Sequence, residues 1–332
     1  MPRPCLYFAT PLPQSPRSEI LEWTFPPPYQ HLTLTGRSRA AWHTSFVIPS
    51  LSLLLDCGLV VNNLRPRHVF ITHGHNDHCL LAPAFLKGPG PETPPEIYCP
   101  KPIAEALETF CQGSIQLNKF LPPVAADAPR GHGRYLLRGV EAGEGWELKT
   151  KDKWTVEAFD CDHSLPCLGY LFSVTNLKLK PEFAGLKGPE IKALRQKGVE
   201  ITAPVTTPVF AFLGDTTIKT LQDEPDWLKN GVKVVITECS FLYEKHRDQA
   251  VKTKHTIWKD LEPVIRKWKE TTFVLIHFSM RYSEKEIIKF FRDMENPPQN
   301  MVIWTDGEPD AHLPEEPAYG SDEWAYAQLK YN

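Results

Sequence analysis

Short apolar runs, separated by polar stretches, recur along most of the chain. They are rich in valine, isoleucine, leucine and phenylalanine, and most are bounded by polar, glycine or proline residues. Runs of this length and composition are typical of buried β-strands. We therefore expect strands at residues 52–58, 67–72, 154–159, 168–174, 208–214, 232–237, 272–278 and 301–304.

Three other stretches show the apolar spacing of amphipathic helices. The first places four residues on one face: Ile103, Leu107, Phe110 and Cys111. The second places five there: Ile257, Leu261, Val264, Ile265 and Trp268. The third opens with Ser283, followed three positions later by Glu286, and this spacing is the capping box that begins a helix.

Strands and helices alternate along the chain without an obvious linker, which favours one α/β domain of layered sheets and helices over residues 1–332. Proline-rich stretches at 24–28, 89–95 and 121–129 are expected to form surface loops. Residues 308–332 are expected to form an acidic, flexible tail.

Composition narrows the class of protein. With 332 residues, 42% of them hydrophobic, the chain can bury a large core, and no apolar run is long enough to span a membrane. A net charge of −3 argues against general nucleic-acid binding but leaves a local basic patch open. Eight scattered cysteines and the lack of an apolar leader predict an intracellular protein, with the cytoplasm, the nucleus and an organelle as alternatives.

The sequence FITHGHNDHCLLAP at residues 70–83 places four metal-ligand side chains directly after an apolar run. They are His73, His75, Asp77 and His78. Imidazole and carboxylate groups are the ligands that zinc and similar ions prefer. Six residues cannot surround one tetrahedral ion with every side chain, so two ions sharing the cluster are the simpler interpretation. A solvated loop with histidines by chance is the alternative.

Two ions need further ligands from distant parts of the chain. His163, Asp215 and His277 each lie at or just beyond the end of an apolar run, where the rim of an active site is expected. Any one of them alone would more often be an ordinary core or surface residue. Together with the 73–78 cluster they form a coherent set of seven.

These seven residues resemble the metal-binding motif of the metallo-β-lactamase fold family. The resemblance implies an αββα sandwich with a binuclear zinc site on its rim. It also implies the ligand assignment, with Asp215 bridging the two ions. One ion is assigned to His73, His75 and His163, and the other to Asp77, His78 and His277. Asp56, in LLLDCG, matches the aspartate that supports the site from behind.

Three further motifs resemble ribonuclease Z, the family of tRNA 3′-processing endonucleases, and most closely its short plant-type members. LIHFSMRYS at 275–283 matches the HFSxRY signature, VVITECSFL at 234–242 matches the glutamate-bearing motif, and KHTIW carries the histidine that pairs with that glutamate. The chain departs from many members in having HCLLAP after the metal motif. The glycine- and proline-rich arm of bacterial members is not evident between His163 and Asp215.

The resemblance assigns roles for phosphodiester hydrolysis, which needs a nucleophile, charge neutralisation and protonation of the leaving oxygen. Two cations about 3.5–4 Å apart lower the pKa of a water molecule and bind the phosphate. Zn²⁺ is expected for both, with Mn²⁺ as the alternative. Asp77 is expected to orient the water or accept its proton, and Glu238 and His255 to protonate the leaving ribose oxygen. Arg281 is expected to bind a phosphate oxygen.

The implied substrate is precursor tRNA, cleaved to leave a 3′-hydroxyl on the tRNA and a 5′-phosphate on the trailer. Residues 178–202 are a candidate RNA-facing insertion, with Lys178 and Lys180 as substrate-binding residues. A homodimer is expected by family resemblance. The alternatives are a general binuclear phosphodiesterase acting on small or cyclic nucleotides, and a catalytically weak RNA-binding relative.

Overall fold

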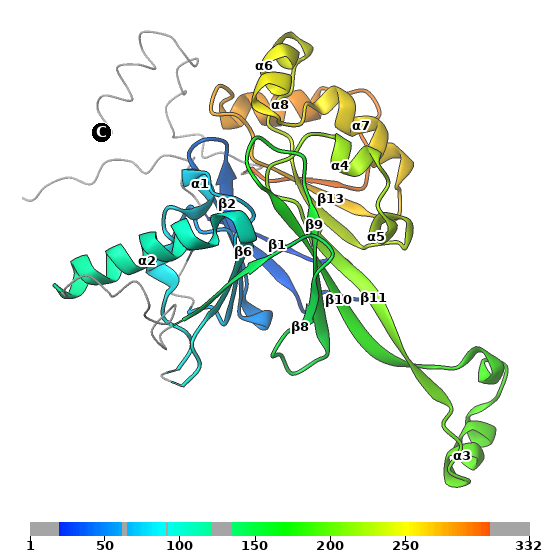
Figure 1. Cartoon of the computed structure of the whole chain (residues 1–332). Helices are drawn as coiled ribbons and strands as arrows, with labels where there is room; N and C mark the ends of the chain where they lie inside the picture. The colour runs from blue at the N-terminus through cyan, green and yellow to red at the C-terminus, as the bar shows by residue number, and fades with distance from the viewer. Residues whose placement is uncertain (1–19, 62–64, 91, 121–134, 306–332) are drawn as a thin grey trace, which may run out of the picture.

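Two mixed β-sheets lie face to face in the computed structural model, which describes residues 20–61, 65–90, 92–120 and 135–305 (Figure 1). Within these ranges each sheet has seven strands. The predicted acidic tail at 308–332 and the predicted loop at 121–129 lie outside the described residues.

The first sheet follows chain order from β1 to β7. Its strands are β1 (Leu21–Thr24), β2 (Thr33–Arg39), β3 (His43–Ile48), β4 (Leu53–Leu55), β5 (His68–Phe70), β6 (Glu96–Pro100) and β7 (Leu136–Val140). The first four pair antiparallel, and β4 to β7 pair parallel.

The second sheet also follows chain order, from β8 to β14. Its strands are β8 (Gly145–Glu147), β9 (Trp154–Asp160), β10 (Leu168–Leu179), β11 (Thr202–Phe212), β12 (Val234–Glu238), β13 (Thr272–Ile276) and β14 (Met301–Ile303). The strands from β8 to β11 pair antiparallel, and those from β11 to β14 pair parallel.

Helices cover the outer faces of the two sheets, apart from α3 (Gly188–Gln196), which lies away from them on the segment between β10 and β11 (Figure 1). The helices are α1 (Asn76–Cys79), α2 (Ala104–Lys119), α3, α4 (Lys219–Gln222), α5 (Asp226–Lys229), α6 (Arg247–Thr253), α7 (Trp258–Lys267) and α8 (Glu284–Arg292), joined by 3₁₀ turns. One apolar cluster fills the space between the two sheets. A second cluster lies between the second sheet and its helices, and a third between the first sheet and its helices. The result is the αββα sandwich that the resemblance implies. Among the described residues, no helix combines the length and apolarity needed to cross a lipid bilayer.

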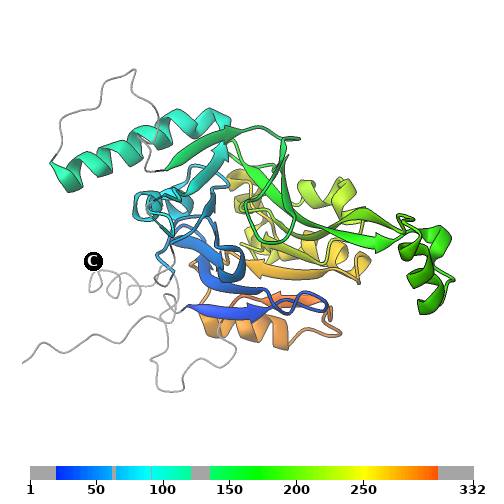
Figure 2. The same cartoon turned by 90° about the horizontal axis from the view of Figure 1, so that it is seen from below.

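The structure confirms all eight predicted strands and all three predicted helices. Their ends shift by a few residues, except that β10 continues to Leu179 and β11 begins at Thr202, well beyond the predicted bounds. Ser283 caps α8 by accepting a hydrogen bond from Glu286 N at 3.1 Å. The expected face of α2 is only partly correct, because Phe110 is 40% exposed while Leu107 and Cys111 are buried. The helix projects beyond the sheet that it covers (Figure 2).

A two-stranded arm projects from the second sheet. The sequence indicated residues 178–202 as an insertion but did not predict this projection. The projection consists of the distal halves of β10 and β11 together with the segment between them, residues 175–205, and we call it the arm. Both views show it extending away from the sandwich toward α3 (Figures 1 and 2). The register continues from Val174–Thr207 to Leu179–Thr202, so the two strands stay paired along this extension.

The two sheets present the ends of several strands at one edge. In the first sheet β4 and β5 run parallel, and in the second β11, β12 and β13 run parallel. β9 shares the direction of β11, because both pair antiparallel with β10. The carboxyl ends of parallel strands meet at one edge, and loops leaving that edge form the usual ligand crevice of such sheets. All of the predicted ligands follow these strand ends.

Candidate metal centre

Seven donor side chains converge at this edge in two groups that share Asp215. Within each group the ligand atoms lie within 4.8 Å of one another. The first group is His73, His75, His163 and Asp215. The second is Asp77, His78, His277 and Asp215. Each group takes two residues from the loop after β5 of the first sheet and two from loops of the second sheet.

The first group faces Asp215 Oδ2. His75 Nδ1 lies 3.0 Å from His73 Nε2 and 3.2 Å from His163 Nε2. Asp215 Oδ2 lies 3.7 Å from His73 Nε2 and 3.9 Å from His163 Nε2. Four ligands around a tetrahedral zinc ion, each about 2.0–2.1 Å from it, are separated by about 3.3 Å. The observed separations bracket that value.

The second group faces the other oxygen of Asp215. Its Oδ1 lies 3.3 Å from both His78 Nε2 and His277 Nε2. Asp77 Oδ2 lies 3.2 Å from His277 Nε2 and 3.7 Å from His78 Nε2. The carboxylate of Asp215 therefore presents one oxygen to each group, which is the geometry of a bridging ligand.

In His73 and His78, the ring nitrogen that points away from the cluster, Nδ1, is bonded to a hydrogen-bond acceptor. His78 Nδ1 donates to Asp56 Oδ2 at 2.7 Å. His73 Nδ1 lies 3.0 Å from Thr72 Oγ1, whose own hydrogen points to Asp56. The hydroxyl must then accept from His73. Both rings thus donate from Nδ1 and turn Nε2 toward the cluster.

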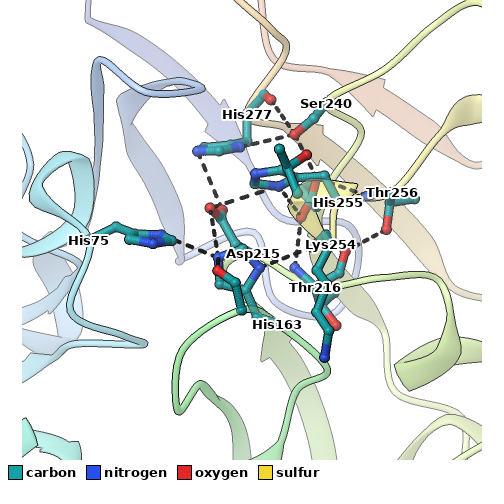
Figure 3. A network of polar contacts seen from close by, with 12 residues as sticks. His75, His163, Asp215, Thr216, Ser240, Lys254, His255, Thr256 and His277 are labelled. Carbon is teal, nitrogen blue, oxygen red and sulfur yellow. Dashed lines mark hydrogen bonds and ion pairs between the residues drawn. The ribbon is translucent and has the colours of Figure 1, made fainter. Parts of the chain in front are cut away.

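The second-sheet histidines are held in the same way. His163 Nδ1 donates to the backbone oxygen of Lys254 at 2.9 Å. His277 Nδ1 lies 3.1 Å from Ser240 Oγ, which donates to Glu238 Oε2 at 2.6 Å and so accepts from His277 (Figure 3). Four histidines therefore hold Nδ1 in a hydrogen bond and direct Nε2 at the two groups, which is the orientation that a metal ligand requires.

Two residues of the site adopt left-handed backbone conformations. Asp56 has φ 57° and His277 has φ 61°. Residues other than glycine adopt this region at an energetic cost and are held there by their surroundings. Asp56 is held by Thr72 N, which donates to its Oδ1 at 2.8 Å, and by His78. The strain places both side chains toward the cluster.

Glu238 and His255 form a hydrogen-bonded pair beside the two groups. Glu238 is fully buried, and its Oε1 lies 2.8 Å from His255 Nδ1. It also accepts from Thr216 N at 2.7 Å and from Thr256 N at 3.1 Å. The buried carboxylate is therefore well satisfied, as a buried charge requires. Burial acts to lower the pKa of His255, but Glu238 outweighs it and raises the pKa to about 9.

The protonation states suit cation binding. Burial lowers the pKa of the three histidines of the first group, so their rings are neutral at pH 7. Burial acts to raise the pKa of Asp77 and Asp215. The facing His277 and His78 outweigh it and hold the pKa of both carboxyls below the usual range. Burial also acts to lower the pKa of His78, but the facing Asp215 and Asp56 outweigh it and raise the pKa, so this ring loses a proton when an ion binds. Neutral imidazoles and ionised carboxylates are the forms that coordinate a metal ion.

A buried oxygen also fits the binding of a cation. Among the described residues, Asp215 Oδ1 is buried and has no hydrogen-bond partner. A buried ionised oxygen without a donor is costly, and a metal ion between it and the facing imidazoles removes that cost. The donor set, the separations and this oxygen together fit a binuclear metal site.

The predicted substrate-binding residues lie outside the two groups. Arg281 donates to Ser279 Oγ at 3.1 Å, bonds Gln249 of α6, and stacks over the ring of Phe241. The Phe241 ring lies 6.3 Å from the ring of His255, so Arg281 is on the same side of the site as His255. The remaining two predicted residues, Lys178 and Lys180, lie on the arm.

Sequence reasoning missed several residues that organise the site. Ser240 connects His277 to Glu238, and Thr216 and Thr256 supply backbone donors to Glu238. Ser240 had a signal, since it lies two positions after Glu238 at the end of the same strand. Lys254 had none, because its contribution to His163 is a backbone oxygen.

Comparisons with known proteins gave several relatives. No family model matches the chain. Two tRNase Z proteins of Arabidopsis thaliana are each 31% identical to this chain over 76% of its length. The match covers 69% of the chloroplastic protein and 88% of the other. The nuclear ribonuclease Z of Triticum aestivum is 32% identical over 52% of this chain and 92% of its own length. The crystal structure of the short form of human tRNase Z matches with a TM-score of 0.49 and 18% identity, over 87% of this chain and 98% of that one.

Proposed function

Because the chain belongs to the ribonuclease Z family, we propose that it is a metal-dependent endoribonuclease that removes 3′ trailers from precursor tRNA by two-metal phosphodiester hydrolysis. The observation that carries the proposal is the pair of ligand groups sharing Asp215, with Glu238 and His255 beside them. A catalytically weak RNA-binding relative would not need this complete set.

The seven convergent side chains are the proposed metal ligands, three histidines or aspartates for each ion and Asp215 for both. We propose Zn²⁺ for both positions, with Mn²⁺ as the alternative. Two such ions, when bound, lower the pKa of a water molecule and neutralise charge on a phosphate. The donor nitrogens and oxygens are already oriented, so little rearrangement accompanies binding.

The chain's own acids and bases complete the proposed reaction. Asp77, whose carboxylate accepts from Ala41 N at 2.9 Å, orients the attacking water or accepts its proton. His255 carries a proton at neutral pH and donates it to the leaving ribose 3′-oxygen. Glu238 holds His255 in place and stabilises its charge. Arg281, on the same side, binds a phosphate oxygen.

The arm is the proposed RNA-binding element. Its segment at 178–197 carries more cations than acids, and its helix α3 has no buried residue. An exposed cationic element projecting from the body can reach phosphates of a large folded RNA far from the scissile bond. A phosphodiester of nucleotide size has no such reach. The arm therefore favours a structured RNA substrate over small or cyclic nucleotides.

The decisive experiment compares a 3′-extended precursor tRNA with a small chromogenic phosphodiester. We expect the full chain to cleave the precursor next to the discriminator nucleotide, leaving a 3′-hydroxyl on the tRNA. A metal chelator should abolish cleavage, and Zn²⁺ or Mn²⁺ should restore it. Hydrolysis of the small diester with no cleavage of the precursor would instead support the general phosphodiesterase.

Changing Lys178 and Lys180 to alanine should weaken binding of the precursor without slowing chemistry. Each lost phosphate contact lowers affinity and reduces the slope of log affinity against log salt by about 1. We expect KM for precursor tRNA to rise about tenfold at moderate salt, with kcat retained. Lys289→Ala, on α8, is the matched control. Equal KM values for the double variant and the control would remove these lysines from the RNA-binding surface.

The quaternary structure and the cellular compartment are proposed from the resemblance to the family. We propose a homodimer whose second subunit helps to hold the RNA. The cytoplasm, the nucleus and an organelle remain alternatives, and the relatives include a chloroplastic and a nuclear protein.

A further inference from the structure

Asp162 connects three loops of the candidate site. It precedes His163, and its Oδ1 accepts from Lys254 Nζ at 2.9 Å. Its Oδ2 accepts from Thr217 Oγ1 at 2.7 Å, and its backbone oxygen accepts from Thr217 N at 2.8 Å. One aspartate thereby ties the loop of His163 to the loop after Asp215 and to the loop before His255.

Lys254 acts on His163 through its backbone. Its carbonyl oxygen accepts from His163 Nδ1 at 2.9 Å, which fixes the ring so that Nε2 faces the first ligand group (Figure 3). Any movement of this carbonyl would release Nδ1 and let the ring rotate. The position of the Lys254 backbone therefore decides where a ligand nitrogen points.

The backbone of Lys254 is held in a conformation that lysine disfavours. The residue ends α6 with φ 54° and ψ 56°, in the left-handed region. Glycine adopts this conformation freely, and lysine adopts it at a cost. The next residue, His255, continues the loop, with its N–H bonded to Ala250 O at 2.9 Å. Because lysine adopts this conformation at a cost, we expect its side chain to make a compensating interaction, and the bond to Asp162 is such an interaction.

The ion pair contributes little to overall stability. The side chain of Lys254 is 45% exposed and that of Asp162 is 35% exposed. Exposed pairs of this kind add little to the free energy of unfolding, because water screens them. The effect of the pair is therefore expected on the geometry of the loop rather than on the stability of the fold.

We propose that Asp162 and Lys254 are positioning residues whose ion pair fixes the Lys254 carbonyl against His163 and so sets the affinity of one of the two metal ions. The proposal deepens the proposed function, because it rests on His163 as a ligand. It predicts a site-selective effect, since the loops of Asp162 and Lys254 carry no residue of the second ligand group, and that group shares only Asp215 with the first.

The test is a zinc titration of the metal-free full chain against a competing chelator, fitted with two binding steps. Lys254→Met and Asp162→Asn should each weaken one step about tenfold and leave the other within twofold. Lys254→Arg keeps the charge and should bind both ions like the parent. Lys289→Met, which breaks the exposed pair with Asp293 on α8, is the matched control and should change neither step.

Lys254→Gly separates the side chain from the backbone. Glycine takes the left-handed conformation without cost but has no bond to Asp162, so we expect the same step to weaken. Parent-like affinity in this variant would show that backbone conformation alone holds His163, which overturns the proposal. Equal losses at both steps, or no loss in Lys254→Met and Asp162→Asn, would also overturn it.

The titration separates this inference from the proposed function, because it requires no RNA. A parent that cleaves precursor tRNA, with variants that keep both zinc affinities, removes the positioning role and leaves the function intact. A parent that binds two zinc ions but leaves precursor tRNA uncleaved removes the function. The melting temperatures of the metal-free variants should match the parent within about 2 °C, since the pair is exposed.

Discussion

His75→Ala is expected to abolish hydrolysis by removing a metal ligand without damaging the fold. His75 Nδ1 lies within 3.2 Å of Nε2 of both His73 and His163. The substitution therefore removes the central ligand of the first group. Losing an ion removes several kcal/mol of transition-state stabilisation, and we expect the cleavage rate of precursor tRNA to fall about 1,000-fold or more. The ring is only partly buried, so its loss should leave no large cavity.

The measurement combines single-turnover cleavage with the metal content of the purified protein. We expect the variant to retain fewer than two ions per chain under conditions where the parent retains both. His31→Ala is the matched control, because His31 is exposed and lies outside the ligand groups. A variant that keeps both ions and parent-like cleavage would show that His75 is not a ligand.

His255→Ala is expected to slow turnover while both ions stay bound. The residue is bonded to Glu238, and its raised pKa of about 9 keeps it protonated at neutral pH. Removing a general acid typically costs about 100- to 10,000-fold in rate. We expect a loss in that range for precursor tRNA, with zinc affinities close to those of the parent.

A substrate with sulfur in place of the scissile 3′-oxygen tests this role directly. A thiolate leaves without protonation, so the defect of His255→Ala should shrink to less than about tenfold on that substrate. Glu238→Gln provides the second variant, since it keeps the shape of the pair but removes the charge that raises the pKa of His255. Loss of metal in His255→Ala, or equal defects on both substrates, would contradict the proton-donor role.

The ligand residues were predictable because the 73–78 cluster follows one apolar run, and His163, Asp215 and His277 each lie at the end of another. The sequence shows where a buried strand ends, and the first polar side chain beyond that end can reach the crevice. All seven predicted ligands lie in the two groups. The pairing of Glu238 with His255 is also confirmed by the structure, whereas their catalytic roles stay predictions.

The strands of the first sheet show what apolar patterning misses. β2 has the polar sequence TLTGRSR, yet Arg37 and Arg39 are buried. Both bond Glu284, at the start of α8, roughly 245 residues later in the chain. A buried ion pair is compatible with a polar strand, but its partner cannot be identified from the strand alone. These residues therefore resemble a loop when the sequence is considered by itself.

The arm was missed for a related reason. Beyond Val174 the paired strands face solvent on both sides, and Leu177 is 72% exposed. Without a buried face there is no alternation of apolar and polar positions to recognise. The cationic composition of 178–202 was visible, but its projection from the sandwich depends on the long register of β10 with β11.

The sharing of each ligand group between the two sheets links metal supply to the lifetime of the protein. In the unfolded chain His78 and His277 of the second group are 199 residues apart, so only the folded sandwich offers a complete set of donors. Ligands that bind the folded chain alone add about 4 kcal/mol to its stability when present at 1,000 times their dissociation constant. In a cell with too little of these ions, a larger fraction of the protein would be unfolded. Proteases would then degrade it before it could compete for RNA.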